Sequence, residues 1–284
     1  MPELPEVEMV VRTLRRQLQG KYVVGVTRGR QPLRRLWPRQ QDAVLATPRQ
    51  VHQVSRRGKW ILIDLADDWV LRFHLGMTGR LRVVPADCAV EPHTHLVLGL
   101  APGQQELRFR DIRRFGSAEL FTRSELAAVW TRERLGPEPF DLNCEQFHAC
   151  LRRSRRCLKA LLLDQTVLAG LGNIYADESL FEAGLYPGRR GDSLRRAEAE
   201  RLRQAILTVI RRAIAKHGST IRDFVFGEDA RGRYQNEFRV YQRSGQPCCR
   251  CGRTLRRLRI AGRSTHYCPG CQPATRMRPT PVGA

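Results

Sequence analysis

Two Cys-x2-Cys motifs near the C-terminus constrain the fold more than any other feature. Cys248 and Cys251 form the first motif, Cys268 and Cys271 form the second, and 16 residues separate them. Each motif offers two thiolates from one tight turn, which is the pattern of a tetrahedral structural zinc site. Disulfides or a redox motif are the alternatives. The spacing predicts one zinc ion per chain in a β-hairpin finger, with no open position for a catalytic water.

The charge balance indicates a polyanionic partner. The 284 residues include 50 Lys and Arg against 28 Asp and Glu, a formal net charge of +22. Arginine, which dominates the positive charge, binds phosphate through a planar fork of donors. Five arginines lie between the two cysteine motifs: Arg253, Arg256, Arg257, Arg259 and Arg263.

Membrane and secretory classes are excluded by the apolar pattern. The chain has no apolar run long enough to span a bilayer, and its acidic N-terminus lacks the apolar core of a signal peptide. We therefore expect a cytoplasmic protein that has no membrane partner. Four scattered cysteines are expected to be buried thiols: Cys88, Cys144, Cys150 and Cys157.

The apolar periodicity changes along the chain and predicts an α+β protein. A helical stripe begins at Val7 and ends before Gly20, and alternating apolar residues from 22 to 121 then indicate an antiparallel β-sandwich. A Pro- and Gly-rich linker at 135–141 precedes a helical region, in which the clearest helix contains Leu202–Ala213. We expect four segments: a sandwich domain (1–134), a helical domain (135–238), the zinc finger (239–273) and a tail (274–284).

Proline at the second position is a candidate nucleophile. A small second residue permits removal of Met1, which leaves Pro2 with a secondary amine of suitable basicity. Attack of that amine on a sugar carbon gives an iminium ion, an electron sink for elimination. Glu3 follows directly and is placed to move protons. A second-position proline is common, so this feature gains weight only from the rest of the chain.

Five motifs in order resemble the bacterial formamidopyrimidine-DNA glycosylases of the Fpg/Nei type. They span nearly the whole chain and imply a helix–two-turn–helix element before the finger. Leu4 favours the branch of the family that acts on oxidised purines. The motifs are Met1–Glu8, His74–Leu81, Asp111–Gly116, Gly170–Glu178 and Gly262–Gln272.

The resemblance implies a bacterial-type bifunctional DNA glycosylase and AP lyase of base-excision repair. It would act as a monomer on double-stranded DNA with oxidised bases or abasic sites, in association with the nucleoid. Pro2 is the implied nucleophile and Glu3 the acid that helps to open the sugar ring, while Glu6 holds the site. Lys59 is the implied lysine that contacts the phosphates flanking the damage and assists the chemistry; a solvated lysine at a strand end is the alternative.

Three residues match the family's fillers of the space that an extruded base leaves: Met77, Arg113 and Phe115. Extrusion of a base costs a few kcal/mol, and apolar wedges can unstack and kink a duplex. An arginine can donate to the orphaned partner base. The alternative is that Met77 and Phe115 are core residues.

Other residues match DNA contacts of the family. Asn173 lies where a Gly-rich turn meets a helix, so it is either a phosphate ligand or an ordinary N-cap. His93 matches a DNA-contacting histidine, or else it caps a strand start. Arg263 is implied both in phosphate binding and in the final δ-elimination. The remaining expected contacts are His74, Lys159 and Tyr241.

Some positions depart from the family pattern and put the preferred lesion in doubt. The 226–234 loop, which covers the extruded base in the family, is unusually charged, His266 stands where Phe is frequent, and Thr94 replaces a common acid. The implied reaction removes 8-oxoguanine and formamidopyrimidines through a Schiff base, followed by β- and δ-elimination. The alternatives are a Nei-type enzyme for oxidised pyrimidines and a non-catalytic zinc-finger DNA-binding protein.

Overall fold

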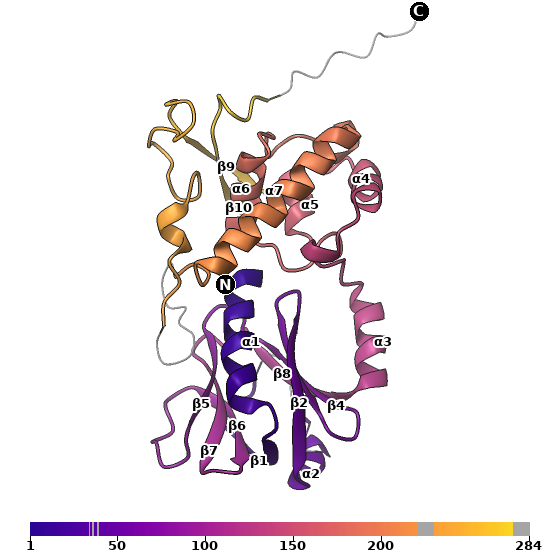
Figure 1. Cartoon of the computed structure of the whole chain (residues 1–284), viewed down its shortest axis with the longest axis vertical. Helices are drawn as coiled ribbons and strands as arrows, with labels where there is room; N and C mark the ends of the chain where they lie inside the picture. Colours follow the sequence, from indigo (N-terminus) through magenta and orange to yellow (C-terminus); the bar gives the residue numbers. More distant parts are fainter. Residues whose placement is uncertain (34, 36, 39, 221–229, 275–284) are drawn as a thin grey trace, which may run out of the picture. The chain divides into compact units, whose positions relative to one another are not determined.

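The computed structural model describes residues 1–33, 35, 37–38, 40–220 and 230–274, arranged in two compact units (Figure 1). Unit 1 comprises Met1–Leu135 and Arg212–Asn236, and unit 2 comprises Gly136–Arg211 and Glu237–Ala284. The first four residues of the charged 226–234 loop, and all but the first residue of the expected tail, lie outside the described residues.

Helix α1 (Leu4–Leu18) opens unit 1 and buries the apolar stripe read from the sequence. Val7, Val11 and Leu14 are almost completely buried. Pro5 stands in the first turn of the helix, where its missing N–H removes no hydrogen bond. The helix packs on strand β2 (Arg49–Arg57) and forms one wall of the unit 1 core.

Eight antiparallel strands build the predicted sandwich. They follow the order β5-β7-β6-β1-β2-β3-β4-β8, and β1 (Tyr22–Arg28) pairs with β2 at only two positions. This short seam joins two four-stranded layers, whose inward side chains form the core. The remaining strands are β3 (Trp60–Leu65), β4 (Trp69–His74), β5 (Gly79–Pro85), β6 (Thr94–Ala101), β7 (Gln105–Asp111) and β8 (Ser117–Thr122).

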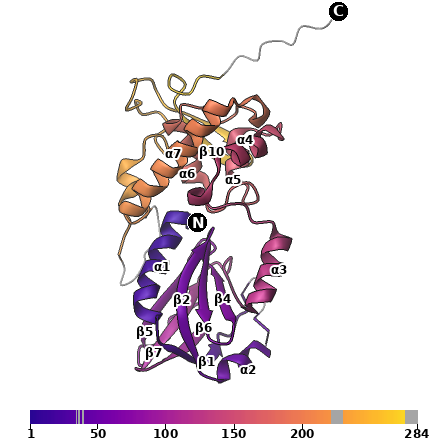
Figure 2. The ribbon, with the colours of Figure 1, turned by 45° about the vertical axis from the view of Figure 1, so that its right-hand side comes forward.

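Two helices of unit 1 were not predicted from the sequence. Helix α2 (Gln40–Ala46) buries only Leu45, so it carries almost no periodic signal. Helix α3 (Arg123–Glu133) buries two residues, and its clearest signal is a capping box between Thr122 and Glu125. Helices α1 and α3 lie on different sides of the sandwich (Figure 2).

Unit 2 is helical and ends in the finger. Its helices are α4 (Cys144–Arg152), α5 (Leu158–Leu163), α6 (Asn173–Glu182) and α7 (Arg196–Ala215), with short 3₁₀ helices at Pro139–Asp141, Gly191–Ser193 and Tyr234–Glu237. The last residues of α7, and most of the third 3₁₀ helix, count with unit 1. Strands β9 (Arg256–Ile260) and β10 (Arg263–Tyr267) form the predicted hairpin. The hairpin turns at Ala261 and Gly262, both with positive φ.

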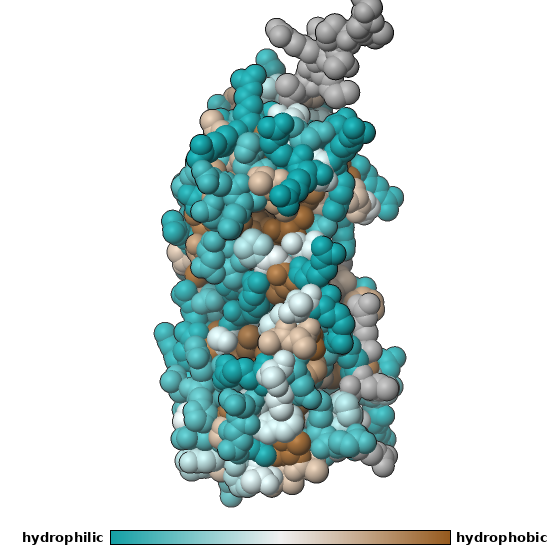
Figure 3. All heavy atoms as spheres, turned by 90° about the vertical axis from the view of Figure 1, so that its right-hand side faces the viewer, coloured by the Kyte–Doolittle hydropathy of each residue, from teal (hydrophilic) through white to brown (hydrophobic). Residues whose placement is uncertain are grey.

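The scattered cysteines correct one expectation. Cys88 is exposed and the other three are only partly buried, although all are free thiols as expected. Cys88 lies in the connection between β5 and β6, outside the strands that form the core. Within the described ranges, no helix is long and apolar enough to cross a membrane. Hydrophilic residues cover most of the face drawn in Figure 3, as the high charge leads one to expect.

Candidate functional site

The N-terminal segment is buried and held by Glu6. Pro2 and Glu3 are both buried, whereas Met1 is half exposed. One oxygen of the Glu6 carboxylate accepts the N–H of Glu3 at 2.9 Å, and the other accepts the N–H and the hydroxyl of Ser219 at 2.7 and 3.0 Å. Gly218 has φ +73°, and a Cβ there would lie 2.9 Å from the carboxylate. Glu6 therefore fixes the start of α1 against the segment after α7.

Charged groups of both signs surround the terminal amine. Burial lowers the pKa of the Met1 amino group from its ordinary value, and four groups act on it through space. They are Glu3, Glu6, Lys59 and Arg113. Lys59 stands in the tight turn between β2 and β3 and is only 7% exposed, so it is not a solvated lysine. The structure thus brings the predicted nucleophile, acid and lysine together within unit 1.

Two loops of the sandwich pack back to back. Gly76 has φ +58°, and a Cβ there would lie 2.5 Å from the Gly116 nitrogen, so only glycine permits this approach. The His74 ring packs edge-on against Trp60 at 4.8 Å, and its Nδ1 accepts the Gly76 N–H at 3.0 Å. The close approach of Gly76 to Gly116 joins the 74–79 turn to the loop that follows β7.

These two loops present the predicted void-filling residues to solvent. Met77 is 42% exposed and Phe115 is 45% exposed, which overturns the alternative that they are core residues. The Arg113 guanidinium lies over the Phe115 ring, 4.7 Å from its centroid. Ile112 is 49% exposed and was missed by sequence reasoning. Its signal was present, because it is a large apolar residue next to charged neighbours in the Asp111–Gly116 motif, as Phe115 is.

Asp111 organises residues 111–116, which we call the void-filling loop after their predicted role. Its carboxylate is fully buried. It accepts the Gly116 N–H at 2.7 Å, the Thr78 hydroxyl at 2.5 Å and the Arg113 N–H at 3.3 Å. The Arg113 N–H also lies 3.1 Å from the Thr78 hydroxyl. The loop is therefore preorganised, and its exposed side chains stand on a fixed base.

The two sandwich histidines differ in their surroundings. His93 is exposed directly before β6, and its carbonyl accepts the Asp111 N–H at 3.0 Å. His95 is buried, with Nε2 2.8 Å from the Asp111 carbonyl and Nδ1 3.1 Å from the Gln31 carbonyl. His93 is thus accessible to a ligand, whereas His95 stabilises the void-filling loop through its contact with the Asp111 carbonyl.

In unit 2, Asn173 and Arg263 belong to neighbouring elements. Asn173 begins α6, and its side-chain amide donates to the Ser264 carbonyl at 3.0 Å. Arg263 is exposed and begins β10, one residue before that carbonyl. We call Asn173 and Arg263 the phosphate clamp, after their predicted role. Asn173, a predicted phosphate ligand, thus lies at a helix N-terminus, where backbone N–H groups favour an anion.

Lys159 and Tyr241 are placed differently from a simple surface contact. Lys159 is fully buried on α5, and its ammonium donates to the Asp177 carboxylate and to the Asn173 carbonyl at 2.5 and 2.8 Å. Tyr241 is partly buried; its N–H donates to Glu178 at 2.8 Å. A direct DNA contact of either residue stays a prediction, and the burial of Lys159 favours a supporting role.

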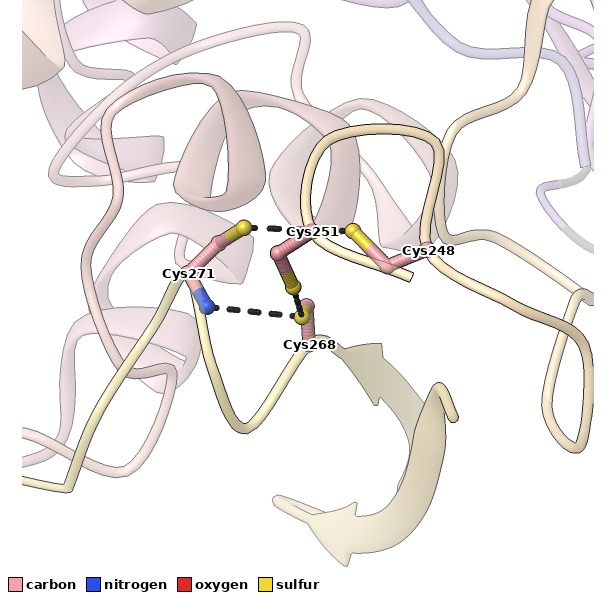
Figure 4. Close-up of side chains that lie close together, drawn as sticks. All are labelled: Cys248, Cys251, Cys268 and Cys271. Carbon is pink, nitrogen blue, oxygen red and sulfur yellow. Dashed lines mark hydrogen bonds between the residues drawn. The ribbon is translucent and has the colours of Figure 1, made fainter. Parts of the chain in front are cut away.

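The four predicted cysteines converge (Figure 4). Their sulfurs all lie within 4.8 Å of one another, with 3.4 Å between Cys251 and Cys268 and 3.8 Å between Cys248 and Cys271. Tetrahedral zinc with Zn–S bonds of about 2.3 Å requires sulfurs about 3.8 Å apart, so the group fits zinc.

The local chemistry also favours a cation. Burial and the neighbouring thiols raise the pKa of Cys268 and Cys271. Burial also acts to raise the pKa of Cys248, but hydrogen bonds from the backbone N–H groups of Arg250 and Cys251 outweigh it and lower this pKa to about 7. Four thiolates in this space need a bound cation, and zinc supplies it while cross-linking the two loops of the finger.

Three family models match successive parts of this chain. The formamidopyrimidine-DNA glycosylase N-terminal domain matches residues 1–118, the H2TH domain of the same enzymes matches 135–225, and the zinc finger found in FPG and IleRS matches 245–274. The formamidopyrimidine-DNA glycosylase of Desulforamulus reducens is 43% identical over 279 residues, which cover 96% of this chain and all of that protein. This chain belongs to the formamidopyrimidine-DNA glycosylase family.

Solved structures of the family share the fold. A mutant FPG of Lactococcus lactis in complex with Fapy-dG-containing DNA is similar with a TM-score of 0.87 and 34% identity. The L. lactis Fpg in complex with abasic-site DNA gives 0.86 at the same identity. Each comparison covers 96% of this chain and the whole of the other. The formamidopyrimidine-DNA glycosylase fold therefore extends over both units and the finger.

Proposed function

We propose that this chain is a bifunctional DNA glycosylase and AP lyase that removes oxidised purines from double-stranded DNA in base-excision repair. The observation that carries the proposal is the buried Pro2–Glu3 start of a family chain, with Lys59 and Arg113 acting on the terminal amine. The DNA-bound L. lactis structures, with Fapy-dG and with an abasic site, support this substrate class.

The reaction begins once Met1 has been removed. The Pro2 nitrogen attacks the sugar C1′ and loses its own proton, the C1′–base bond breaks and the base leaves with a proton, and Glu3 protonates the ring oxygen as the ring opens. The resulting iminium ion acidifies the C2′ proton. Loss of that proton to a base expels the 3′ phosphate, and loss of the C4′ proton then expels the 5′ phosphate. Water hydrolyses the remaining iminium ion and frees Pro2. Lys59 binds the flanking phosphates and assists the chemistry, and Arg263 assists the last step.

The remaining site residues divide into two groups. Met77, Arg113 and Phe115 occupy the space of the extruded base. The phosphate clamp binds the DNA backbone, and the other proposed DNA contacts are His74, His93, Lys159 and Tyr241.

One copy of the chain acts alone. The proposed segments of the chain are 1–134, 135–238, 239–273 and 274–284. The zinc ion holds the finger together without taking part in the chemistry.

Borohydride trapping on abasic DNA tests the proposal. The protein with a free Pro2 should form a covalent, reducible complex, while a protein with a blocked N-terminus should form none. A cleavable N-terminal tag supplies the matched pair, before and after removal of the tag. Pro2→Gly, which leaves a primary amine, should retain part of the trapping.

Equal trapping by the tagged and untagged forms would rule out Pro2 as the nucleophile, and the absence of trapping by both would favour a non-catalytic DNA-binding protein. Excision from duplexes with 8-oxoguanine, a formamidopyrimidine or an oxidised pyrimidine separates the purine enzyme from the Nei-type alternative.

A further inference from the structure

A buried carboxylate links three elements of unit 2. Asp177 on α6 is completely buried, and one of its oxygens accepts the ammonium of Lys159 on α5 at 2.5 Å. Its other oxygen accepts both the backbone N–H and the ring Nδ1 of His266 on β10, each at 3.0 Å. A charge buried this deeply is maintained only when partners satisfy it, so these contacts constrain the positions of all three elements.

The next residue holds the other end of the finger. Glu178 is 2% exposed, and its carboxylate accepts backbone N–H groups of three successive residues, Arg239, Val240 and Tyr241, at 2.8 to 3.2 Å. That segment leads into the first cysteine motif. The Tyr241 ring also packs edge-on against the His266 ring at 5.1 Å. Consecutive acids of α6 therefore hold both the entry to the finger and its second strand.

This arrangement places the phosphate clamp. Asp177 lies four residues after Asn173, about one helical turn along α6, and His266 lies three residues after Arg263 in β10. The same two elements meet again at the Asn173–Ser264 hydrogen bond. The Asp177–His266 contact thus sets how β10 lies along α6, and with it where the Arg263 guanidinium stands relative to the helix N-terminus.

We propose that Asp177, acting through His266, is the positioning residue of the phosphate clamp. This inference rests on the proposed function, because the clamp has a purpose only in a DNA-binding enzyme. Neither Asp177 nor His266 needs to touch DNA. Their role is to hold Arg263 and Asn173 at the spacing that one phosphate backbone requires, before DNA arrives.

A double-mutant cycle on DNA binding tests the proposal. The ligand is a duplex with a tetrahydrofuran abasic-site analogue, which lacks the C1′ hydroxyl and is not cleaved. Asp177→Asn should weaken binding by roughly tenfold, the size of one lost hydrogen bond to a charged group. It should also flatten the salt dependence of binding, as Arg263→Ala does by about one phosphate contact. In an Arg263→Ala background, Asp177→Asn should add almost nothing.

Glu182→Gln is the matched control. Glu182 lies on the same helix, and its ion pairs of 2.9 and 2.7 Å reach Arg239 and Arg250 rather than a residue of β10. It should change the Kd by less than about twofold, as expected for partly exposed pairs. Zinc content, measured for every variant, verifies that the finger is loaded.

Additive losses from Asp177→Asn and Arg263→Ala, or an unchanged salt dependence in Asp177→Asn, overturn the proposal. Because Asp177→Asn leaves Lys159 without its anionic partner, a second variant decides the question if this one fails to fold. That variant is His266→Phe, which removes only the ring hydrogen bond and keeps the backbone one. Its loss should be roughly threefold and should vanish in Arg263→Ala; a loss of equal size in both backgrounds refutes the coupling. Trapping of abasic DNA by the wild-type protein separately tests the proposed function.

Discussion

Each unit holds candidate DNA-binding residues close to a buried aspartate, and the two aspartates are satisfied in different ways. Asp111 in unit 1 accepts neutral donors, namely two backbone N–H groups and the Thr78 hydroxyl. Asp177 in unit 2 accepts a lysine ammonium and both donors of His266. The first network closes within neighbouring loops of one sandwich. The second joins α6 to the preceding helix α5 and to β10, whose His266 lies 89 residues further along the chain.

Because of this difference, the void-filling loop and the phosphate clamp depend on different parts of the structure. The void-filling loop rests on contacts within the sandwich. The phosphate clamp depends on β10, and His266 lies two residues before the zinc ligand Cys268. Loss of the metal should therefore disable the clamp while the void-filling loop stays intact. We expect base extrusion and backbone binding to be separable by mutation.

The largest expected effect comes from Cys268→Ser. Loss of zinc should unfold the finger and weaken binding to any duplex by about a hundredfold or more, because several phosphate contacts disappear together. The four tryptophans, Trp37, Trp60, Trp69 and Trp130, all belong to unit 1. Their fluorescence during urea unfolding should be unchanged. A shifted midpoint would mean that the two sites are not independent.

The next effect is expected from Asp111→Asn. The amide leaves buried N–H groups poorly paired, at about 1–3 kcal/mol each, so the void-filling loop should loosen. Excision of a paired lesion should fall by roughly ten- to a hundredfold, while binding to tetrahydrofuran DNA should change little. Glu106→Gln, on the same strand with an ion pair to Arg108 at 2.7 Å, is the control. If Asp111→Asn weakens binding instead, the contrast with Asp177 is lost.

A third pair of variants separates extrusion from backbone binding directly. Arg113→Ala removes the group that replaces the lost base pair, so excision of a paired lesion should fall by up to about a hundredfold, the scale of the extrusion cost. Cleavage at a pre-formed abasic site should fall much less. Arg263→Ala should weaken damaged and undamaged DNA alike and reduce the salt slope by about one. Equal losses of both activities in Arg113→Ala would make Arg113 another phosphate contact.

Much of this organisation could be predicted from the sequence. The stripe of α1, the turn at Asp67 and Asp68 between β3 and β4, and the zinc finger are all encoded by local spacing. Local rules succeed there because each element carries its own periodicity or ligand pattern. Helix α3 escaped prediction because it buries only Leu126 and Val129. Its identity comes from packing against the sandwich.

The supporting carboxylates could not be predicted for a related reason. Lys159 stands in an apolar run, which hints at a buried ion pair, but its partner Asp177 is known only from the packing of α5 and α6. In the sequence, Asp111 is indistinguishable from an ordinary acidic loop residue, because its hydrogen bonds form only in the folded structure. The candidate ligand-binding groups belong to recognisable motifs, whereas the groups that hold them depend on tertiary contacts.

The smallest effect is expected from Ile112, the exposed apolar residue of the void-filling loop. Isoleucine is among the side chains that act as wedges between base steps, and here its neighbours Asp111 and Arg113 are fixed by hydrogen bonds. Ile112→Ala should lower excision of a paired lesion by about two- to fivefold, since only part of one apolar contact is lost. Val90→Ala, at a 61% exposed apolar position of the same unit, should have no effect. If the two variants behave alike, the wedge consists of Met77 and Phe115 alone, and Ile112 is only a surface residue of a loop that Asp111 holds in place.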